Sequence, residues 1–256
     1  MRTLSQQAEV NAPGGDAYDK NAFAITSFEL HVWTVRMPTD LATISLCRET
    51  LSPQERARAA EMVHAPTRTS HVVMRSAARL LLSRYLRLPP DHIRISAGSN
   101  GKPTIQGPLG FNIGHSGVIG LVAFALGCEV GVDVEVARPF EDMEALTTRF
   151  FCVEEAEEIR RVSSVDRPMA FYRCWTRKEA YVKALGSGLS TPLDSFRVSI
   201  AADEPVRFMR LPEGSSAWSL YDLEVEEGYV AALAHPGAAR SVNVRRLDLL
   251  PLLLGR

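Results

Sequence analysis

The chain has 256 residues, a formal net charge of −1, 46% hydrophobic residues and 23% charged residues. This length allows one large domain or two small ones with a sizeable core, and the composition is ordinary for a soluble globular protein. Because the net charge is close to zero, nothing global indicates a nucleic-acid partner.

The cysteines and the apolar runs exclude several classes of protein. There are four cysteines: Cys47, Cys128, Cys152 and Cys174. They show no CxxC or Cys/His spacing, which argues against a zinc site and a disulfide framework and fits a reducing compartment. The N-terminus has no apolar signal region, and the longest apolar runs, 121–126 and 249–254, are too short to span a bilayer. We therefore expect a cytoplasmic protein with no membrane partner.

The chain begins with a polar stretch, which is followed by a strand and a helix. Residues 1–22 are polar and small, a composition typical of a disordered extension. Alternation of apolar and polar residues over 28–35 predicts a strand. Ser52, Pro53 and Glu55 indicate the start of a helix, because they supply a cap, a first-turn proline and a capping box.

A longer helix is predicted from about residue 68 to residue 86, where apolar residues recur at helical spacing. Arg68, Arg75 and Arg79 lie at positions i, i+7 and i+11, so they form one basic stripe on this helix. Such a stripe is most simply a solvated face. The alternative is an anion-binding site.

Two turns in the middle of the chain carry polar residues of interest. Lys102 lies in the predicted turn 100–103. The segment 114–117 is a small-residue loop in which His115 and Ser116 can join backbone N–H groups around a phosphate. Alone this signal is weak, because a histidine in a glycine-containing turn is usually only a polar loop residue.

The segment 130–136 holds the strongest chemical signal in the chain. Its valines alternate with acidic residues, so Asp133 and Glu135 share one face of the predicted strand. The predicted helix 166–185 places Glu179 and Lys183 on one ridge at four-residue spacing. The simpler interpretations are a solvated strand face and a surface ion pair worth ~0.3–0.5 kcal/mol.

If Glu179 packs beside this strand, three carboxylates meet at one point. Two such charges ~4 Å apart repel by about 4 kcal/mol at an effective dielectric of about 20. A cluster of this kind needs a cation, and an all-oxygen ligand set favours magnesium, manganese or calcium over zinc.

The remaining part of the second half is predicted to contain two more helices and four strands. The helix expected over 153–162 carries four glutamates, among them Glu154 and Glu155. They are most simply a solvated face, although one of them near Asp133 could act as a base. Strand-like runs occupy 196–200, 206–211, 218–223 and 228–234.

Both halves of the chain have the same order of a strand, then helices, then several strands. We therefore predict an α+β fold of two similar, pseudo-symmetric lobes, 23–128 and 129–240, with the active site in the cleft between them. Each lobe is expected to be a small, mainly antiparallel sheet with helices packed on it. Residues 241–256 are expected to form a C-terminal tail.

Three segments, GVDVE, RFFCVEEAEEI and WTRKEAYVKALGSGLS, resemble the 4′-phosphopantetheinyl transferases of the surfactin type. The upstream segments GKP, at 101–103, and FNIGHS, at 111–116, are similar to two further segments of that family. Five motifs in order at compatible spacing make the resemblance specific, and it covers roughly residues 28–235. One departure is Gly114, where the family commonly has a serine.

The resemblance implies an enzyme that moves the 4′-phosphopantetheine arm of coenzyme A to a serine of an acyl or peptidyl carrier protein and releases 3′,5′-ADP. Carriers of polyketide, nonribosomal-peptide and fatty-acid synthesis are all compatible with it. It implies that Asp133, Glu135 and Glu179 bind magnesium or manganese, and that Glu179 belongs to the catalytic set. The length of the chain is that of family members that act as monomers.

The resemblance also assigns roles to residues around this acidic group. Lys183 would contact the pyrophosphate and assist the leaving phosphate. Lys102, His115 and Ser116 match positions at the phosphates of the coenzyme. Arg68 matches a position near the adenosine 3′-phosphate. Glu155 matches a proposed base, with its neighbour Glu154 as the alternative.

Two other functions use the same residues. A metal-dependent phosphohydrolase would release its product without any carrier protein. A non-catalytic protein that binds coenzyme A or a carrier would keep the phosphate contacts but lack a working metal set, and the intact acidic residues count against it.

Overall fold

The computed structural model describes residues 20–255. Most of the segment predicted to be disordered, 1–22, lies outside this range. Its last residues belong to a short 3-10 helix, Lys20–Phe23, and the ring of Phe23 stacks on Trp33 with centroids 5.2 Å apart. The first lobe therefore begins with an aromatic contact that holds the start of the described chain against the core.

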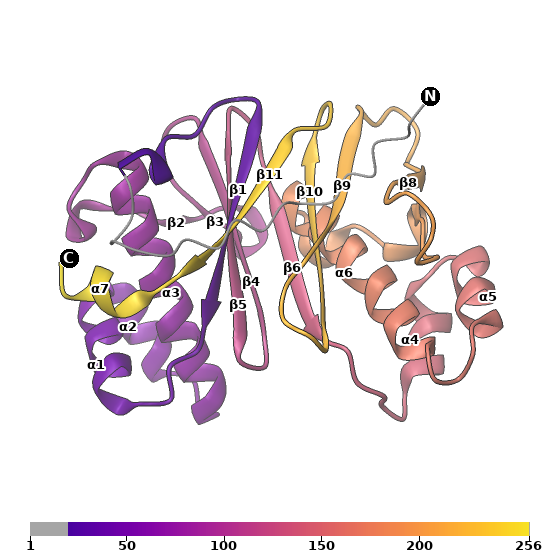
Figure 1. The fold of residues 1–256 in the computed structure, drawn as a ribbon, viewed down its shortest axis with the longest axis horizontal. Helices are drawn as coiled ribbons and strands as arrows, with labels where there is room; N and C mark the ends of the chain where they lie inside the picture. Colours follow the sequence, from indigo (N-terminus) through magenta and orange to yellow (C-terminus); the bar gives the residue numbers. More distant parts are fainter. Residues whose placement is uncertain (1–19, 256) are drawn as a thin grey trace.

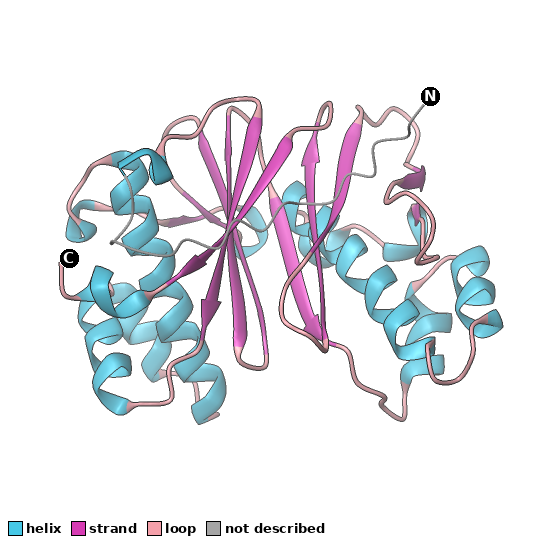
Figure 2. Cartoon of the chain, viewed as in Figure 1, coloured by secondary structure: helices cyan, strands magenta, loops and turns pink. Residues whose placement is uncertain are grey.

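Two sheets stand in the middle of the molecule, and helices cover the outer face of each (Figures 1 and 2). The first sheet has the strand order β11-β1-β5-β4 and the second the order β6-β10-β9. The strands are β1 (Glu29–Arg36), β4 (Leu109–Ser116), β5 (Ile119–Leu126), β6 (Gly131–Val136), β9 (Trp218–Leu223), β10 (Tyr229–Pro236) and β11 (Ser241–Leu247). Two short pairs complete the set, namely β2 (Ser96–Ala97) with β3 (Pro103–Thr104), and β7 (Arg197–Val198) with β8 (Phe208–Arg210).

The helices form two groups, one on each side of the sheets. The group beside the first sheet contains α1 (Leu41–Thr50), α2 (Pro53–Ala60), α3 (Ala65–Leu86) and α7 (Leu249–Leu253). The group beside the second sheet contains α4 (Met143–Phe150), α5 (Val153–Arg161) and α6 (Arg167–Leu185). The predicted α+β fold, with small, mainly antiparallel sheets carrying helices, is confirmed.

Three apolar cores hold these layers together, and alternation along the strands assigns residues to them. In β1, Leu30 and Val32 face the second sheet, whereas Trp33 and Val35 face the helices of the first lobe. Side chains alternate in this way because successive residues of a strand point to opposite faces. β5 is buried along almost its whole length because both of its faces are covered in the same manner.

The prediction that residues 241–256 form a C-terminal tail is wrong for most of this segment. β11 pairs in parallel with β1, from Glu29 opposite Ser241 to Val35 opposite Leu247, so the last strand completes the sheet of the first lobe. The following helix α7 buries two leucines in the core of that lobe. The sequence pattern missed this strand because its partner lies more than 200 positions away and its two faces enter different cores.

The predicted start of α2 is confirmed, whereas the basic stripe predicted on α3 is not a single kind of surface. The capping box of α2 is present, with Ser52 N donating to Glu55 at 2.8 Å and Glu55 N donating to Ser52 at 3.2 Å. Arg79, by contrast, is only 2% exposed and donates to Glu55 and to backbone carbonyls. It is a structural ion-pair partner, and neither the solvated face nor the anion site describes it.

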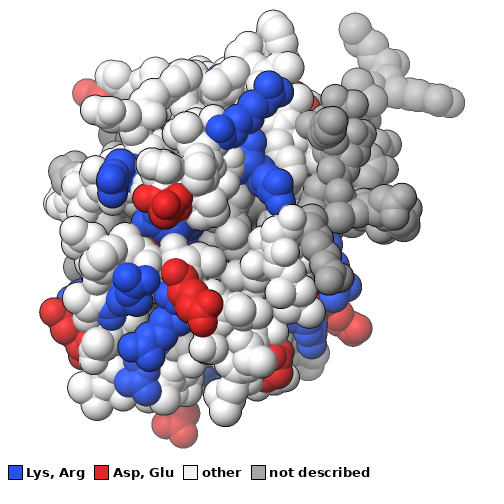
Figure 3. Space-filling view, turned by 90° about the vertical axis from the view of Figure 1, so that its left-hand side faces the viewer, with Lys and Arg blue, Asp and Glu red and all other residues white. Residues whose placement is uncertain are grey.

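Within the described part of the chain, no helix has the length and apolar character needed to cross a membrane. Figure 3 shows the helical face that lies on the left of Figure 1, and on it basic and acidic side chains are interspersed. This face presents no field of a single sign, which agrees with the near-neutral net charge.

We predict that Leu247→Ala lowers the free energy of unfolding by roughly 2–5 kcal/mol, because Leu247 is 4% exposed in the core and truncation leaves a cavity. Arg246→Ala, at the exposed neighbouring position of the same strand, should change it by less than about 0.5 kcal/mol. Urea unfolding followed by circular dichroism measures both. Equal stability of the two variants would mean that 241–247 behaves as a tail.

Candidate active site

The strand β6 and the helix α6 lie against each other without an intervening side chain. A Cβ atom at Gly131 would stand 2.0 Å from Ala180 O and 2.3 Å from Ala184 N, so only glycine permits this approach. Because α6 passes so close, its ridge of acidic and basic residues lies over the polar face of β6. The predicted meeting of the three carboxylates depends on this packing of α6 on β6.

Buried charges fix α6 from its other side. Arg177 is 1% exposed and binds Asp222 of β9 through two hydrogen bonds of 2.8 and 2.6 Å. Lys178 is fully buried, and its ammonium lies 2.8 Å from a carboxylate oxygen of Glu155. Bidentate and charge-assisted contacts of this kind define orientation as well as energy, so they fix the rotation of α6 that points Glu179 and Lys183 toward β6.

Asp133 is the most deeply buried of the three predicted metal ligands. It is 4% exposed, and its Oδ1 atom lies 2.6 Å from Lys183 Nζ. Its Oδ2 atom is buried and has no hydrogen-bond partner among residues 20–255. Burial raises the pKa of Asp133, and the Lys183 charge opposes that shift.

Glu135 faces the end of β4 at the junction of the two lobes. The hydroxyl of Ser116 donates to Glu135 Oε2 at 2.7 Å and accepts from Val136 N at 3.3 Å. Desolvation raises the pKa of Glu135, and the charge of Asp133 raises it further. Ser116 therefore lies beside the acidic group.

Glu179 completes the acidic group from α6. Burial raises its pKa, and the charges of Asp133 and Glu135 add to this shift, whereas Lys183 lowers it. The three carboxyl groups are therefore close enough to oppose one another's ionisation. Burial alone would lower the pKa of Lys183, but Asp133 and the two glutamates raise it overall.

The carboxylate oxygens of the acidic group decide whether it fits a divalent cation. As the side chains lie, no set of three His, Cys, Asp or Glu residues in the described chain has metal-holding geometry. Lys183 takes one oxygen of Asp133. The donors are nevertheless all carboxylate oxygens, one is orphaned, and all three carboxyl groups resist ionisation. These properties fit a hard cation such as magnesium or manganese.

Two imidazoles and a guanidinium lie close to one another in the first lobe, and one of them, His115, lies near the acidic group. Desolvation and the Lys183 charge lower the pKa of His115, and Asp133 opposes them. His71 of α3 is near enough for His115 and Arg75 to contribute to the lowering of its own pKa, which is due mainly to burial. Its Nε2 atom is buried and has no partner in the part of the chain that the structure describes.

Sequence reasoning missed His71 as a candidate. It lies three positions after Arg68 and four before Arg75, so it shares their face of α3, and that spacing could have included it. Arg68 itself is exposed and donates to Met62 O at 2.9 Å. The structure does not bring Arg68 into the acidic group.

The structure does not place Lys102 at the acidic group either. Its ammonium binds Ala184 O at 3.0 Å, Val130 O at 3.2 Å and Glu129 Oε2 at 2.5 Å. All three partners are protein oxygens at the boundary between the lobes.

The placement of Glu155 does not fit the general base expected from the sequence. Glu155 is fully buried, where it accepts from Cys152 N at 3.0 Å and Val198 N at 2.8 Å and pairs with Lys178. A carboxylate enclosed in this way has no route to a substrate. Glu154 is exposed and pairs with Arg210.

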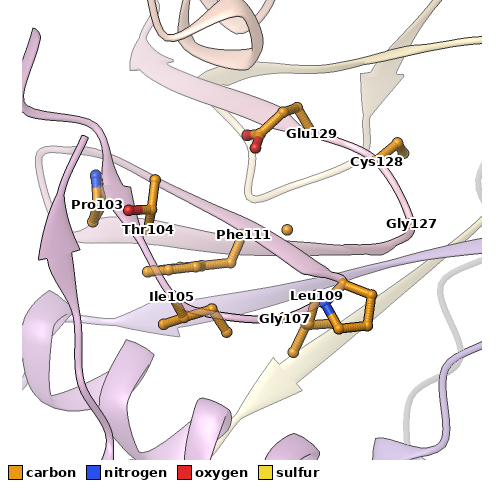
Figure 4. Close-up of a pocket in the computed structure, with 11 residues that line it drawn as sticks. Pro103, Thr104, Ile105, Gly107, Leu109, Phe111, Gly127, Cys128 and Glu129 are labelled. Carbon is orange, nitrogen blue, oxygen red and sulfur yellow. The ribbon is translucent and has the colours of Figure 1, made fainter. Parts of the chain in front are cut away.

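The structure contains a pocket of about 390 Å³ whose lining does not include Asp133, Glu135 or Glu179. It lies between the start of β4 and the turn that leads into β6 and is lined by residues 103–105, 107–111 and 127–129 (Figure 4). His115 and Ser116 stand at the opposite end of β4. With a rise of about 3.3 Å per residue along a strand, this pocket is separate from the acidic group.

Residues 129–234 match the sequence model of the 4′-phosphopantetheinyl transferase superfamily. The chain is 32% identical over 218 residues to the 4′-phosphopantetheinyl transferase HetI of Nostoc sp., which covers 83% of this chain and 90% of that protein. It is also 32% identical over 198 residues to the 4′-phosphopantetheinyl transferase Sfp of Bacillus subtilis, covering 76% and 87% respectively.

Solved structures show weaker likenesses. A holo-(acyl-carrier-protein) synthase from Bacillus anthracis, in complex with CoA (3′,5′-ADP), has a TM-score of 0.37 and 15% identity, covering 43% of this chain and 96% of that one. The synthase of Thermotoga maritima has a TM-score of 0.33 and 18% identity, covering 43% and 64%.

We predict that Glu155→Ala lowers the free energy of unfolding by roughly 3–5 kcal/mol, because it leaves Lys178 as an uncompensated buried charge. Glu154→Ala, at the exposed neighbouring position, should change it by less than about 0.5 kcal/mol. Chemical denaturation measures both values. An unchanged stability in Glu155→Ala would contradict the structural role of this carboxylate.

The raised pKa values of the acidic group make the stability of the folded protein depend on pH. A carboxyl group whose pKa is higher in the folded than in the unfolded protein binds more protons when folded, so stability falls as pH rises from the unfolded pKa through the folded one. Glu179→Gln should therefore raise the melting temperature in metal-free buffer at neutral pH. The gain should shrink as pH falls through the folded pKa and vanish below about 4, where both states become protonated.

The exposed variant Glu224→Gln is the matched control and should leave the melting temperature unchanged at every pH. A lower melting temperature for Glu179→Gln at neutral pH would show that its carboxylate is not repelled in the folded protein.

Proposed function

The chain belongs to the 4′-phosphopantetheinyl transferase superfamily, and we propose that it transfers the 4′-phosphopantetheine arm of coenzyme A to a serine of an acyl or peptidyl carrier protein, releasing 3′,5′-ADP. The observation that supports this most directly is the meeting of Asp133, Glu135 and Glu179 beside Lys183. The three acidic residues would hold magnesium or manganese, which when bound neutralises charge on the pyrophosphate.

Lys183 supplies the positive charge on the protein side of the reaction. Its ammonium lies 2.6 Å from Asp133 and keeps its proton, because the surrounding carboxylates raise its pKa. A fixed cation at this point would stabilise the negative charge that develops on the leaving phosphate of 3′,5′-ADP. Since the ammonium is already in place, its orientation costs little at the moment of reaction.

The proton of the carrier serine needs an acceptor near the same point. Glu155 is enclosed, whereas Glu179 lies within the acidic group with a pKa raised by burial and by Asp133. We therefore assign proton acceptance to a carboxylate oxygen of Glu179 that does not hold the metal.

The coenzyme's phosphates would lie against the first lobe. His115 and Ser116 stand at the end of β4 beside the acidic group, and His71 and Arg75 extend this polar surface along α3. The unpartnered Nε2 of His71 would be satisfied by a phosphate oxygen. The protein is proposed to act as a monomer, and the carrier would present its serine to this junction of the lobes.

We predict that Asp133→Ala and Glu179→Ala each lower the rate of transfer by at least about a hundredfold, because each removes a carboxylate from the set that would hold the metal. The assay incubates a candidate apo carrier protein with coenzyme A and magnesium and follows the gain of one phosphopantetheine by intact-mass spectrometry. The exposed variant Glu227→Gln is the control and should retain the full rate.

Chelation with EDTA should stop the transfer by the wild-type protein, and added magnesium or manganese should restore it. Full activity in either alanine variant would exclude a metal-binding role for these carboxylates. Breakdown of coenzyme A without any modified carrier would favour a phosphohydrolase instead.

A further inference from the structure

The C-terminus of α6 is held by a turn of the first lobe. Lys102 donates to Ala184 O at 3.0 Å, and Asn100 Nδ2 donates to Gly186 O at 3.0 Å. The last carbonyl groups of a helix have no partners within the helix, and a cation there also interacts favourably with the helix dipole. The turn therefore caps, from the other lobe, the helix that carries Glu179 and Lys183.

The same ammonium also holds the start of β6. Lys102 donates to Val130 O at 3.2 Å, one residue before the strand that carries Asp133 and Glu135. Ala184 follows Lys183 directly in the sequence. One side chain thus ties together the two elements whose relative register brings the acidic group and Lys183 to one point.

Two further features keep Lys102 in this position. Glu129, on the turn before β6 (Figure 4), pairs with its ammonium at 2.5 Å, and the lysine side chain is only 9% exposed. The turn itself is closed by a hydrogen bond of 2.7 Å from Gly98 N to Lys102 O, with Asn100 in the left-handed region at φ 60°. Every donor of the Lys102 ammonium faces a protein oxygen.

We propose that Lys102 is a positioning residue, which holds β6 and α6 in the register that the acidic group requires, and that it does not bind a phosphate of the coenzyme. This inference rests on the proposed transferase function. Loss of an interaction that orients the groups around a metal typically costs 10–100-fold in activity. We therefore expect kcat to fall by that factor in Lys102→Met, while the KM for coenzyme A stays close to the wild-type value.

The test compares Lys102→Met and Glu129→Gln with the control Arg94→Met, which removes an exposed cation from the same lobe. Three quantities are measured for each protein: kcat and KM for transfer, the Kd of 3′,5′-ADP by calorimetry without metal, and amide hydrogen exchange over residues 182–187. The exchange measurement needs no catalysis, so it tests the clamp even if the transferase assignment fails.

The positioning role predicts faster exchange over 182–187 and a lower kcat in both clamp variants, with the Kd of 3′,5′-ADP unchanged in Lys102→Met. A phosphate-binding role predicts a Kd weaker by about tenfold or more in Lys102→Met, since a charge-assisted contact is lost. It also predicts tighter binding in Glu129→Gln, where the lysine is released. Either of these binding results, or unchanged exchange in Lys102→Met, would overturn the proposal.

Discussion

The absence of a side chain at position 131 lets α6 lie directly on β6, and the geometry of the site depends on this contact. The nearest backbone atoms of α6 leave no room for a Cβ atom there. At the resulting separation, Glu179 and Lys183 reach the polar face of β6, where Asp133 and Glu135 lie. Any residue other than glycine would move the helix outward, so the acidic group would separate even though all its members were present.

Charges in this protein have two different uses, because some are paired and fully satisfied whereas others lie beside charges of the same sign. Arg177 with Asp222 and Lys178 with Glu155 are paired and satisfied, and they orient α6. The three carboxyl groups beside Lys183 all have raised pKa values. Residues with a purely structural role would not need such an arrangement. Perturbed pKa values of this kind cluster at functional sites because the same repulsion that costs stability creates affinity for a cation.

The two lobes are joined by more than the apolar core between their sheets. β11 returns from the end of the second lobe to complete the first sheet, and Lys102 reaches from the first lobe to the ends of β6 and α6. The site at the junction is therefore supported from both sides. A change in either lobe can alter its geometry without touching a residue that meets substrate.

Local patterns in the sequence determined the fold class, the capping box of α2, the face shared by Asp133 and Glu135, and the ridge shared by Glu179 and Lys183, because each of these depends only on strand or helix periodicity. Tertiary structure alone decided that Glu155 is enclosed, that Arg79 and Lys102 bind protein oxygens, that His71 lies near His115, and that 241–247 is a strand. These outcomes depend on which distant segments meet, and periodicity carries no information about such contacts.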